Sequence, residues 1–169
     1  MPNSLRGRVR ALAFSLFPAY FGTGARITYA SADWREVRVK LPLSWRSRNY
    51  VGTIFGGSMY GAVDPIYMVM LIKNLGAEYT VWDKSATIRF RRPGKSTLTA
   101  HFALDAAELD TIRELTASGA PIDRVYSVDL LDRQGKICAT IEKTIYIRRR
   151  AAEKPTRERS NPQPAAVTP

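Results

Sequence analysis

A single acid, Asp64, stands in a long apolar stretch of the chain and is its first candidate for chemistry. Between Arg48 and Lys73 no other residue carries a charge. A carboxylate in such surroundings either caps a helix or takes part in a reaction as a base or a nucleophile. The apolar residues around it predict a long helix within residues 49–73, which the chain enters through glycines.

The pair Asp64-Pro65 leaves two interpretations of this helix open. Asp followed by Pro is typical of an N-cap and a first helical residue, so a helix that begins at Pro65 would use Asp64 only as its cap. A helix that begins near Gly57 would instead contain Pro65, at a cost of about 3 kcal/mol and with the carbonyl of Gly61 left free. A kink that aims Asp64 at a subunit interface would be a reason for that cost.

The composition indicates one basic domain. With 169 residues, of which 45% are hydrophobic, the chain is long enough for a single core. Its net charge of +11 favours anionic ligands such as a phosphorylated cofactor, acidic lipid headgroups or nucleic acid. The single cysteine, Cys138, excludes an internal disulfide framework and a cysteine-based zinc site, and it indicates a reducing, cytoplasmic compartment. We expect no metal site.

The two ends are expected to differ from the domain between them. Residues 1–25 predict a helix and a turn packed on a domain that spans residues 26–150. The arginines and apolar run near the start also resemble a secretory signal peptide, but the proline and aromatic residues of that run favour a short amphipathic helix. Residues 151–169 are rich in Pro, Ala and charge, which predicts a disordered tail. No apolar run reaches the roughly 18 residues needed to span a bilayer.

Alternation of apolar and polar residues predicts a β-sheet around the apolar helix. Strands are expected over residues 26–30, 34–41, 79–92, 96–105, 123–132 and 136–150, with a surface helix over 106–118. A turn at Pro93-Gly94 is expected to lead from one long strand into an antiparallel neighbour. The last strand is long enough to lie in mid-sheet or at a dimer seam. One of its registers holds Ile137, Ala139, Ile141, Lys143, Ile145 and Ile147.

An antiparallel sheet has to bury one face, and a helix of about 20 residues, roughly 30 Å long, can fill it. The expected fold class is therefore α+β, with a curved antiparallel sheet packed on one long central helix.

Three segments carry a family resemblance: RNYVGTIFGGSMYGAVDPIYMVML, VWDKSATIRFRRPG and KTIYIRRR. Together they resemble the DUF4442 branch of the hot dog superfamily, which is related to PaaI-type acyl-CoA thioesterases. The resemblance covers most of residues 15–150. It implies the hot dog fold, in which a curved sheet wraps a central helix, two subunits pair their sheets, and the active sites lie at the subunit interface.

The resemblance also implies roles for individual residues. PaaI-like enzymes have an Asn before a Gly-Gly pair at the helix entrance and an acid seven residues after the second Gly. Asn49, Gly56, Gly57 and Asp64 stand in those places. The backbone N–H of Gly57 would then hold the thioester oxygen, and Asp64 would be the base or nucleophile. Asn49 and Asp83, the latter on the strand after the helix, would orient water or the thioester.

One residue departs from the family pattern. Phe55 stands where PaaI-like sequences usually have a His before the glycines, which removes a hydrogen-bonding group beside the substrate. The single histidine, His101, lies on a predicted strand without the context of a hydratase site. The resemblance therefore favours thioester hydrolysis over hydration, and it leaves open a protein that binds the ligand without turning it over.

The expected ligand is an acyl thioester, and coenzyme A enters only as part of that substrate. The acyl chain is expected along the helix, near Phe55, Met59 and Tyr60. Arginine suits phosphate groups because its planar fork binds two oxygens. The basic residues expected to meet the nucleotide part of coenzyme A are Arg89, Arg91, Arg92 and Lys95. Aromatic residues do not alternate with the basic ones as in an RNA-binding platform, so nucleic acid is not the expected partner.

Two functions are carried forward. The first is hydrolysis of an acyl thioester by a homodimer or homotetramer. The alternative is a non-catalytic acyl-CoA or lipid binding protein with the same fold, in which Phe55 replaces the histidine.

Overall fold

The computed structural model describes residues 12–150. Its strands are β1 (Arg26–Ala30), β2 (Glu36–Leu41), β3 (Tyr79–Phe90), β4 (Leu98–Ala103), β5 (Ile122–Leu131) and β6 (Ile137–Arg149). Its helices are α2 (Pro18–Gly22), α3 (Gly56–Val63), α4 (Ile66–Leu75) and α5 (Ala106–Leu115). Residues 12–15 are also helical. The predicted tail and most of the predicted first helix lie outside the described residues.

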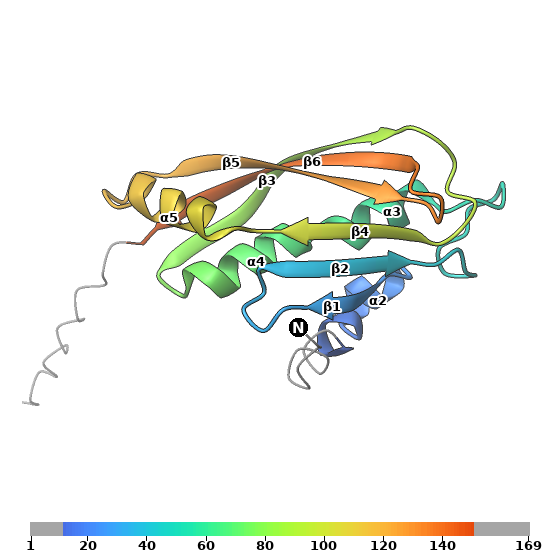
Figure 1. Cartoon of the computed structure of the whole chain (residues 1–169), viewed down its shortest axis with the longest axis horizontal. Helices are drawn as coiled ribbons and strands as arrows, with labels where there is room; N and C mark the ends of the chain where they lie inside the picture. Colours follow the sequence, from blue (N-terminus) through green and yellow to red (C-terminus); the bar gives the residue numbers. More distant parts are fainter. Residues whose placement is uncertain (1–11, 151–169) are drawn as a thin grey trace, which may run out of the picture.

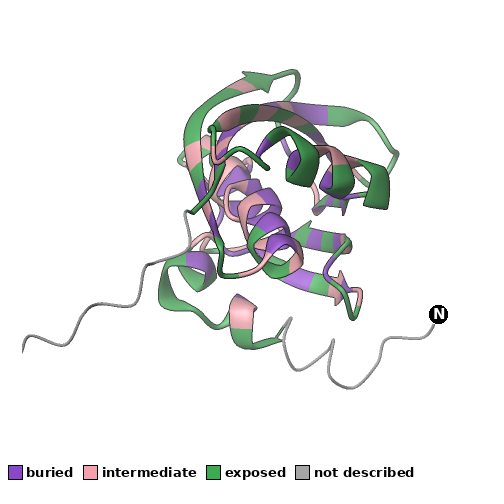
Figure 2. Cartoon of the chain, turned by 90° about the vertical axis from the view of Figure 1, so that its left-hand side faces the viewer, coloured by how far each residue is buried: buried purple, intermediate pink, exposed green. Residues whose placement is uncertain are grey.

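All six strands form one antiparallel sheet in the order β1-β2-β4-β5-β6-β3. The sheet curves around the α3–α4 helix, as Figure 1 and the end-on view in Figure 2 show. Apolar side chains of β2 and β4 alternate inward and are buried, for example Val37, Leu41 and Phe102. This confirms the predicted α+β architecture, because the helix fills the one face that the sheet has to bury.

The turn at Pro93-Gly94 does not make the expected antiparallel neighbours. β3 pairs with β6 at one edge of the sheet, whereas β4 pairs with β2 and β5 in its interior. The connection between β3 and β4 passes the entrance of α3, where Ile54 N donates to Gly94 O at 2.9 Å. The expected hairpin is therefore wrong, because this segment pairs with the helix entrance instead of closing a two-stranded turn.

The central helix begins at Gly56 and not at Pro65. Asp64 and Pro65 both have right-handed helical backbone angles, and Asp64 N donates to Tyr60 O at 2.9 Å. Pro65 has no N–H, so it interrupts the helix between α3 and α4 without ending its path. The side chain of Asp64 is thus not a helix cap, and the kinked-helix interpretation is the one the structure shows.

Residues 12–25 lie against the domain through specific contacts. The hydroxyl of Tyr20, which is 4% exposed, donates to Ala62 O at 2.9 Å. Ile27 N donates to the hydroxyl of Ser15 at 3.0 Å. No helix among residues 12–150 is long and apolar enough to cross a membrane.

Candidate active site

Three ionisable side chains from distant parts of the chain meet at the break between α3 and α4. The ammonium of Lys143, on β6, lies 2.8 Å from Asp64 Oδ1 and 2.8 Å from Asp83 Oδ2. It also donates to the carbonyl oxygen of Asp64. An ammonium has three N–H donors, and these three oxygens can use all of them. We call Asp64, Asp83 and Lys143 the acid–lysine cluster.

The local structure explains why these groups meet. Lys143 shares the inward register of β6 with Ile141 and Ile145, and its side chain is 1% exposed. A charge at such a position must be paired, because desolvating an isolated ammonium costs several kcal/mol. The register of β3 shifts between Asp83 and Ser85, and such a bulge re-aims a side chain. Asp83 therefore reaches Lys143 from the strand edge while Asp64 reaches it from the helix break.

The two acids of the cluster differ in their surroundings. Burial raises the pKa of Asp83 above its usual range; the charge of Asp64 adds to that rise, and Lys143 opposes it. Asp83 Oδ1 is buried and has no hydrogen-bond partner within residues 12–150. Asp64 keeps 37% of its side chain exposed, against 25% for Asp83. Asp64 is thus the more accessible acid, and Asp83 is the one whose protonated form is favoured by its surroundings.

Tyr60 borders the same cluster. Its ring centroid lies 5.9 Å from Lys143 Nζ, which is within the range of a cation–π contact. Burial, followed by the neighbouring Asp64, raises the pKa of the Tyr60 hydroxyl. The phenol therefore stays protonated at neutral pH and can act as a hydrogen-bond donor beside Asp64.

The start of α3 presents free backbone donors. The N–H groups of a first helical turn have no intrahelical acceptor, and the helix dipole makes this end positive. Phe55 occupies the N-cap position without a side-chain hydrogen bond, and Gly57 is exposed. A Cβ added at Gly57 would overlap the ring of Phe55, and one at Gly56 would lie 2.8 Å from Phe90 Cζ. Two aromatic rings thus crowd this helix entrance, and a side chain at either glycine would require a ring to move.

Gly57 and Asp64 do not meet within one chain. Asp64 follows Gly57 by about two helical turns on the same side of the helix, which is about 10 Å along the axis. A single carbonyl group cannot touch both. One copy of the chain thus contains both predicted functional groups but does not bring them together.

The remaining predicted residues lie around the helix entrance or beneath it. Asn49 is bonded within its own loop, where its side-chain amide donates to Thr53 Oγ1 at 2.9 Å and its Oδ1 accepts from Thr53 N at 2.9 Å. Phe55 is 56% exposed, whereas Met59 is 3% exposed and belongs to the core. The assignment of these residues to the substrate stays a prediction.

The predicted basic residues are all exposed at the end of β3 and in the turn after it: Arg89, Arg91, Arg92 and Lys95. The backbone N–H groups of Arg91 and Arg92 both donate to Cys138 O, at 2.8 and 3.2 Å. Because Phe90 lies against Gly56, this basic segment is next to the positive end of α3. The arrangement offers an electropositive rim beside the helix entrance.

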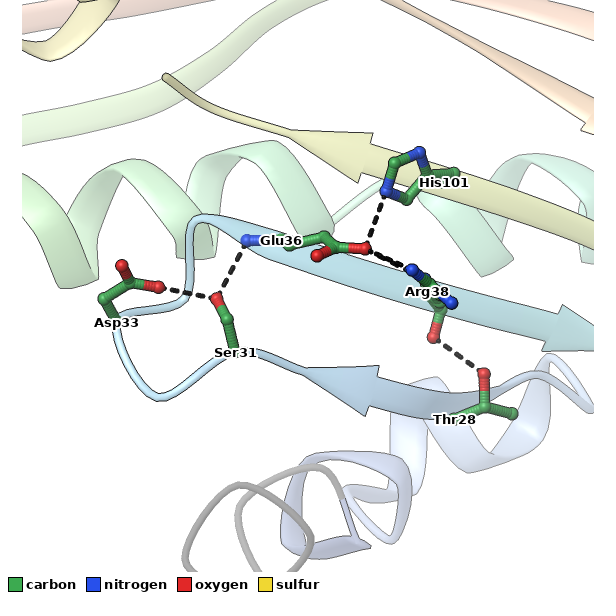
Figure 3. Close-up of polar contacts among 6 residues, drawn as sticks. All are labelled: Thr28, Ser31, Asp33, Glu36, Arg38 and His101. Carbon is green, nitrogen blue, oxygen red and sulfur yellow. Dashed lines mark hydrogen bonds and ion pairs between the residues drawn. The ribbon is translucent and has the colours of Figure 1, made fainter. Parts of the chain in front are cut away.

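His101 lies away from this site, on the outer face of the sheet. Its Nε2 is 3.0 Å from Glu36 Oε1, and the same oxygen accepts from Arg38 at 2.7 Å (Figure 3). The hydrogen bond from Arg38 is the first cause that holds the pKa of Glu36 below its usual range. The histidine thus belongs to an exposed polar network on β2 and β4.

Sequence reasoning missed Lys143 as a member of the site. A signal was available, because it is the one charged residue in a register otherwise made of Ile and Ala. A lysine at an inward position of a long strand needs an acid, and the two acids predicted for the site are its partners.

Comparison with known proteins places the chain among proteins of the same architecture. The family model described as a domain of unknown function, DUF4442, matches residues 7–147. No curated protein matches the chain.

Solved structures give the same result for the fold. PA5026 of Pseudomonas aeruginosa, a protein of unknown function, is 19% identical, with a TM-score of 0.74 over 87% of this chain and 97% of that one. The thioesterase HI1161 of Haemophilus influenzae is 17% identical, with a TM-score of 0.60 over 81% of this chain and 87% of that one. A mutant form of the thioesterase PA1618 of Pseudomonas aeruginosa is 13% identical, with a TM-score of 0.64 over 88% of this chain and 96% of that one. The predicted hot dog fold is confirmed.

Proposed function

Because the chain belongs to the DUF4442 family and has the hot dog fold, we propose that it hydrolyses an acyl thioester, with coenzyme A as the carrier. The observation that carries this proposal is the acid–lysine cluster, which holds the accessible carboxylate of Asp64 beside a buried cation at a break in the central helix. Two thioesterases with the same fold add support.

The proposed reaction uses the first turn of α3 from one copy of the chain and the end of α3, at the helix break, from another. The Gly57 N–H of one copy donates to the thioester carbonyl oxygen and stabilises the oxyanion as it forms. Asp64 of the other copy accepts a proton from water, whose oxygen adds to the carbonyl carbon. Alternatively the carboxylate itself adds to that carbon, and water then hydrolyses the resulting acyl anhydride to free the acid and restore Asp64. In both routes the C–S bond breaks after the first addition, and the thiolate takes up a proton. Tyr60 and Asp83 orient the water or the thioester.

The proposed second copy docks on β3. This strand is at the edge of the sheet, so one side of its backbone has no strand beside it within residues 12–150. Ser85, Ala86 and Thr87 are all exposed although they lie in the middle of a 12-residue strand. A long edge strand of this kind is a template for pairing with another chain. A dimer paired through β3 would let Gly57 and Asp64 of different copies face one thioester, and two such dimers would make a tetramer.

A second function is favoured by the ring of Phe55. This ring lies against Gly57, where the expected oxyanion donor is. A hydrophobic side chain at that place can shield the N–H and supplies no hydrogen bond to substrate. A non-catalytic protein that binds acyl-CoA or another acyl lipid is therefore the alternative.

A hydrolysis assay separates the two functions. Purified protein is incubated with a panel of acyl-CoAs, and the free thiol is measured over time. We expect thiol release well above the uncatalysed rate for at least one member of the panel. Tight binding of an acyl-CoA without thiol release would instead establish the non-catalytic alternative.

Substitution of Thr87 by Lys tests the proposed interface. Thr87 lies opposite Glu142 in the β3–β6 register, so the new lysine gains an opposite charge across the strands and the protomer is expected to fold. At the interface the same charge disfavours pairing of two β3 strands. We expect sedimentation velocity to show a shift from dimer to monomer, together with loss of hydrolysis.

The matched control is Ala103→Lys, which places a lysine opposite Glu36 on the interior strand β4. It should leave the oligomeric state unchanged. A Thr87→Lys protein that remains dimeric would show that β3 is not the interface.

A further inference from the structure

A cavity of about 340 Å³ lies between residues 14–23, here called the N-terminal segment, and the break in the central helix. Its outer wall includes Phe14, Phe17 and Tyr20, and its inner wall includes Pro65 and Met68. All of these residues have apolar or aromatic side chains. Phe17 is 64% exposed.

The outer wall is held against the helix by contacts of Tyr20 and Thr23. Tyr20 donates its hydroxyl to Ala62 O at 2.9 Å, and its ring packs edge-on against Phe14 with centroids 5.0 Å apart. A Cβ at Gly61 would lie 2.7 Å from Thr23 Cγ2, so a glycine allows the segment to come close to the helix at that point. The cavity is therefore a built feature of the fold.

Asp64 connects this cavity to the proposed chemistry. It lines the cavity and also holds Lys143 at 2.8 Å. A ligand for this place should have a long apolar part and, at its end, a polar group that reacts with a carboxylate. The acyl part of a thioester has that form.

We infer that this cavity binds the acyl chain, so that residues 14–23 form the acyl-binding wall. The inference rests on the proposed function and names its substrate as a thioester with a long apolar acyl chain. This position of the acyl chain differs from the one expected from the sequence, which ran past Phe55 and Met59. Met59 is 3% exposed and packs in the core, so it is not available to line an acyl site. Water in an apolar cavity gains little hydrogen bonding, so replacing it by methylene groups is favourable.

The test fills the cavity from its exposed side. Ala19 lines the cavity and is exposed, so Ala19→Trp should fold and place an indole where the chain would lie. The matched control is Ala13→Trp, just before the same segment and also exposed, which lines the neighbouring cavity of Trp34 and Lys73 and not the one proposed for the acyl chain. Phe17→Ala is a second variant, which removes one wall instead of filling the space.

Two readouts are compared over saturated acyl groups of increasing length. The first is kcat/KM for the acyl-CoAs, and the second is equilibrium binding of non-hydrolysable acyl thioether analogues. In the wild type we expect kcat/KM and the binding affinity each to rise about fourfold for each added methylene until the cavity is full. In Ala19→Trp this rise should stop at short chains, with at least a tenfold loss for the longest ones, and Phe17→Ala should weaken the long chains by a similar factor. Ala13→Trp should follow the wild type.

The two readouts keep this inference separate from the proposed function. Binding that depends on chain length and is lost in Ala19→Trp, without any hydrolysis, would support the acyl cavity and overturn the thioesterase proposal. Hydrolysis whose chain-length dependence is the same in Ala19→Trp and in the wild type would overturn the acyl cavity and leave the thioesterase proposal standing. Binding that is independent of chain length would also overturn it.

Discussion

Asp64→Asn is expected to lower kcat/KM for the best acyl-CoA at least 100-fold. An amide has nearly the same shape as the carboxylate but cannot accept a proton from water or form the acyl intermediate. A positioned acid or base contributes roughly 10² to 10⁴ in rate. The substitution leaves Lys143 paired with Asp83 at 2.8 Å, so the cation keeps an acid and the fold is retained.

The measurement is thiol release under saturating and subsaturating substrate. Asp110→Asn is the control, because Asp110 is an exposed acid on α5 that pairs with Arg113 on the same helix and is not part of the acid–lysine cluster. It should match the wild type. Binding of an acyl thioether should also be unchanged in Asp64→Asn, which separates lost chemistry from lost binding. An Asp64→Asn enzyme with wild-type kcat/KM would sink the proposed mechanism.

The role of Asp64 shows where sequence reasoning stops. Its apolar surroundings predict a helix, but Asp-Pro is equally typical of a helix start and of a kink. The choice depends on Lys143, which is 79 residues away and binds both the carboxylate and the carbonyl of Asp64. A local pattern cannot contain the contact that decides between its own alternatives.

The strands were predictable within a few residues, while their order was not. Alternation gives each strand its buried face, and all six expected strands are present. The partners of a strand depend on long connections, and Pro93-Gly94 gives no sign that β3 and β4 lie apart in the sheet. The bulge that aims Asp83 at Lys143 likewise depends on pairing with β6.

The cavity proposed to bind the acyl chain also could not be predicted from the sequence. Phe14, Phe17 and Tyr20 predict an amphipathic segment, but periodicity does not say which element they cover. The hydroxyl of Tyr20 and the close approach of Thr23 to Gly61 define that position, and both are contacts across about 40 residues of chain. The sequence predicted a helix packed on the domain, and tertiary contacts determine which part of the central helix it covers.

Lys143→Met is the second prediction with a large expected effect. It should lower the free energy of unfolding at pH 7 by about 3 kcal/mol, because removing one member of a buried ion pair leaves its partners uncompensated. Here two carboxylates, Asp64 and Asp83, would face each other without the cation that each meets at 2.8 Å. Methionine fills nearly the same space, so the loss is electrostatic and not that of a cavity.

Urea unfolding at pH 7 gives the size of the effect. Lys136→Met is the control, because Lys136 is exposed just before the same strand, and surface changes usually stay within about 0.5 kcal/mol. Equal destabilisation by both substitutions would show that the buried pairing contributes nothing.

The pH dependence distinguishes lost charge from lost packing. A carboxyl whose pKa is higher in the folded protein binds more protons when folded, so its contribution to stability falls as the pH rises from the unfolded pKa, about 4, to the folded one. Burial already raises the pKa of Asp83, and loss of Lys143 removes the interaction that opposes the rise. The Lys143→Met protein should therefore recover stability as the pH is lowered from 7 towards the unfolded pKa of about 4, by up to about 1.4 kcal/mol per pH unit for each added proton. This recovery should be steeper than in the wild type.

Asp83→Asn in the same background completes the argument. It removes one of the two uncompensated charges, so the double variant should be more stable at pH 7 than Lys143→Met alone and should depend less on pH. In the wild-type background the same change leaves Asp64 and Lys143 as a neutral pair and should cost little. If Asp83→Asn destabilised both backgrounds equally, Asp83 and Lys143 would not be coupled, and the acid–lysine cluster would not be the electrostatic unit that its geometry indicates.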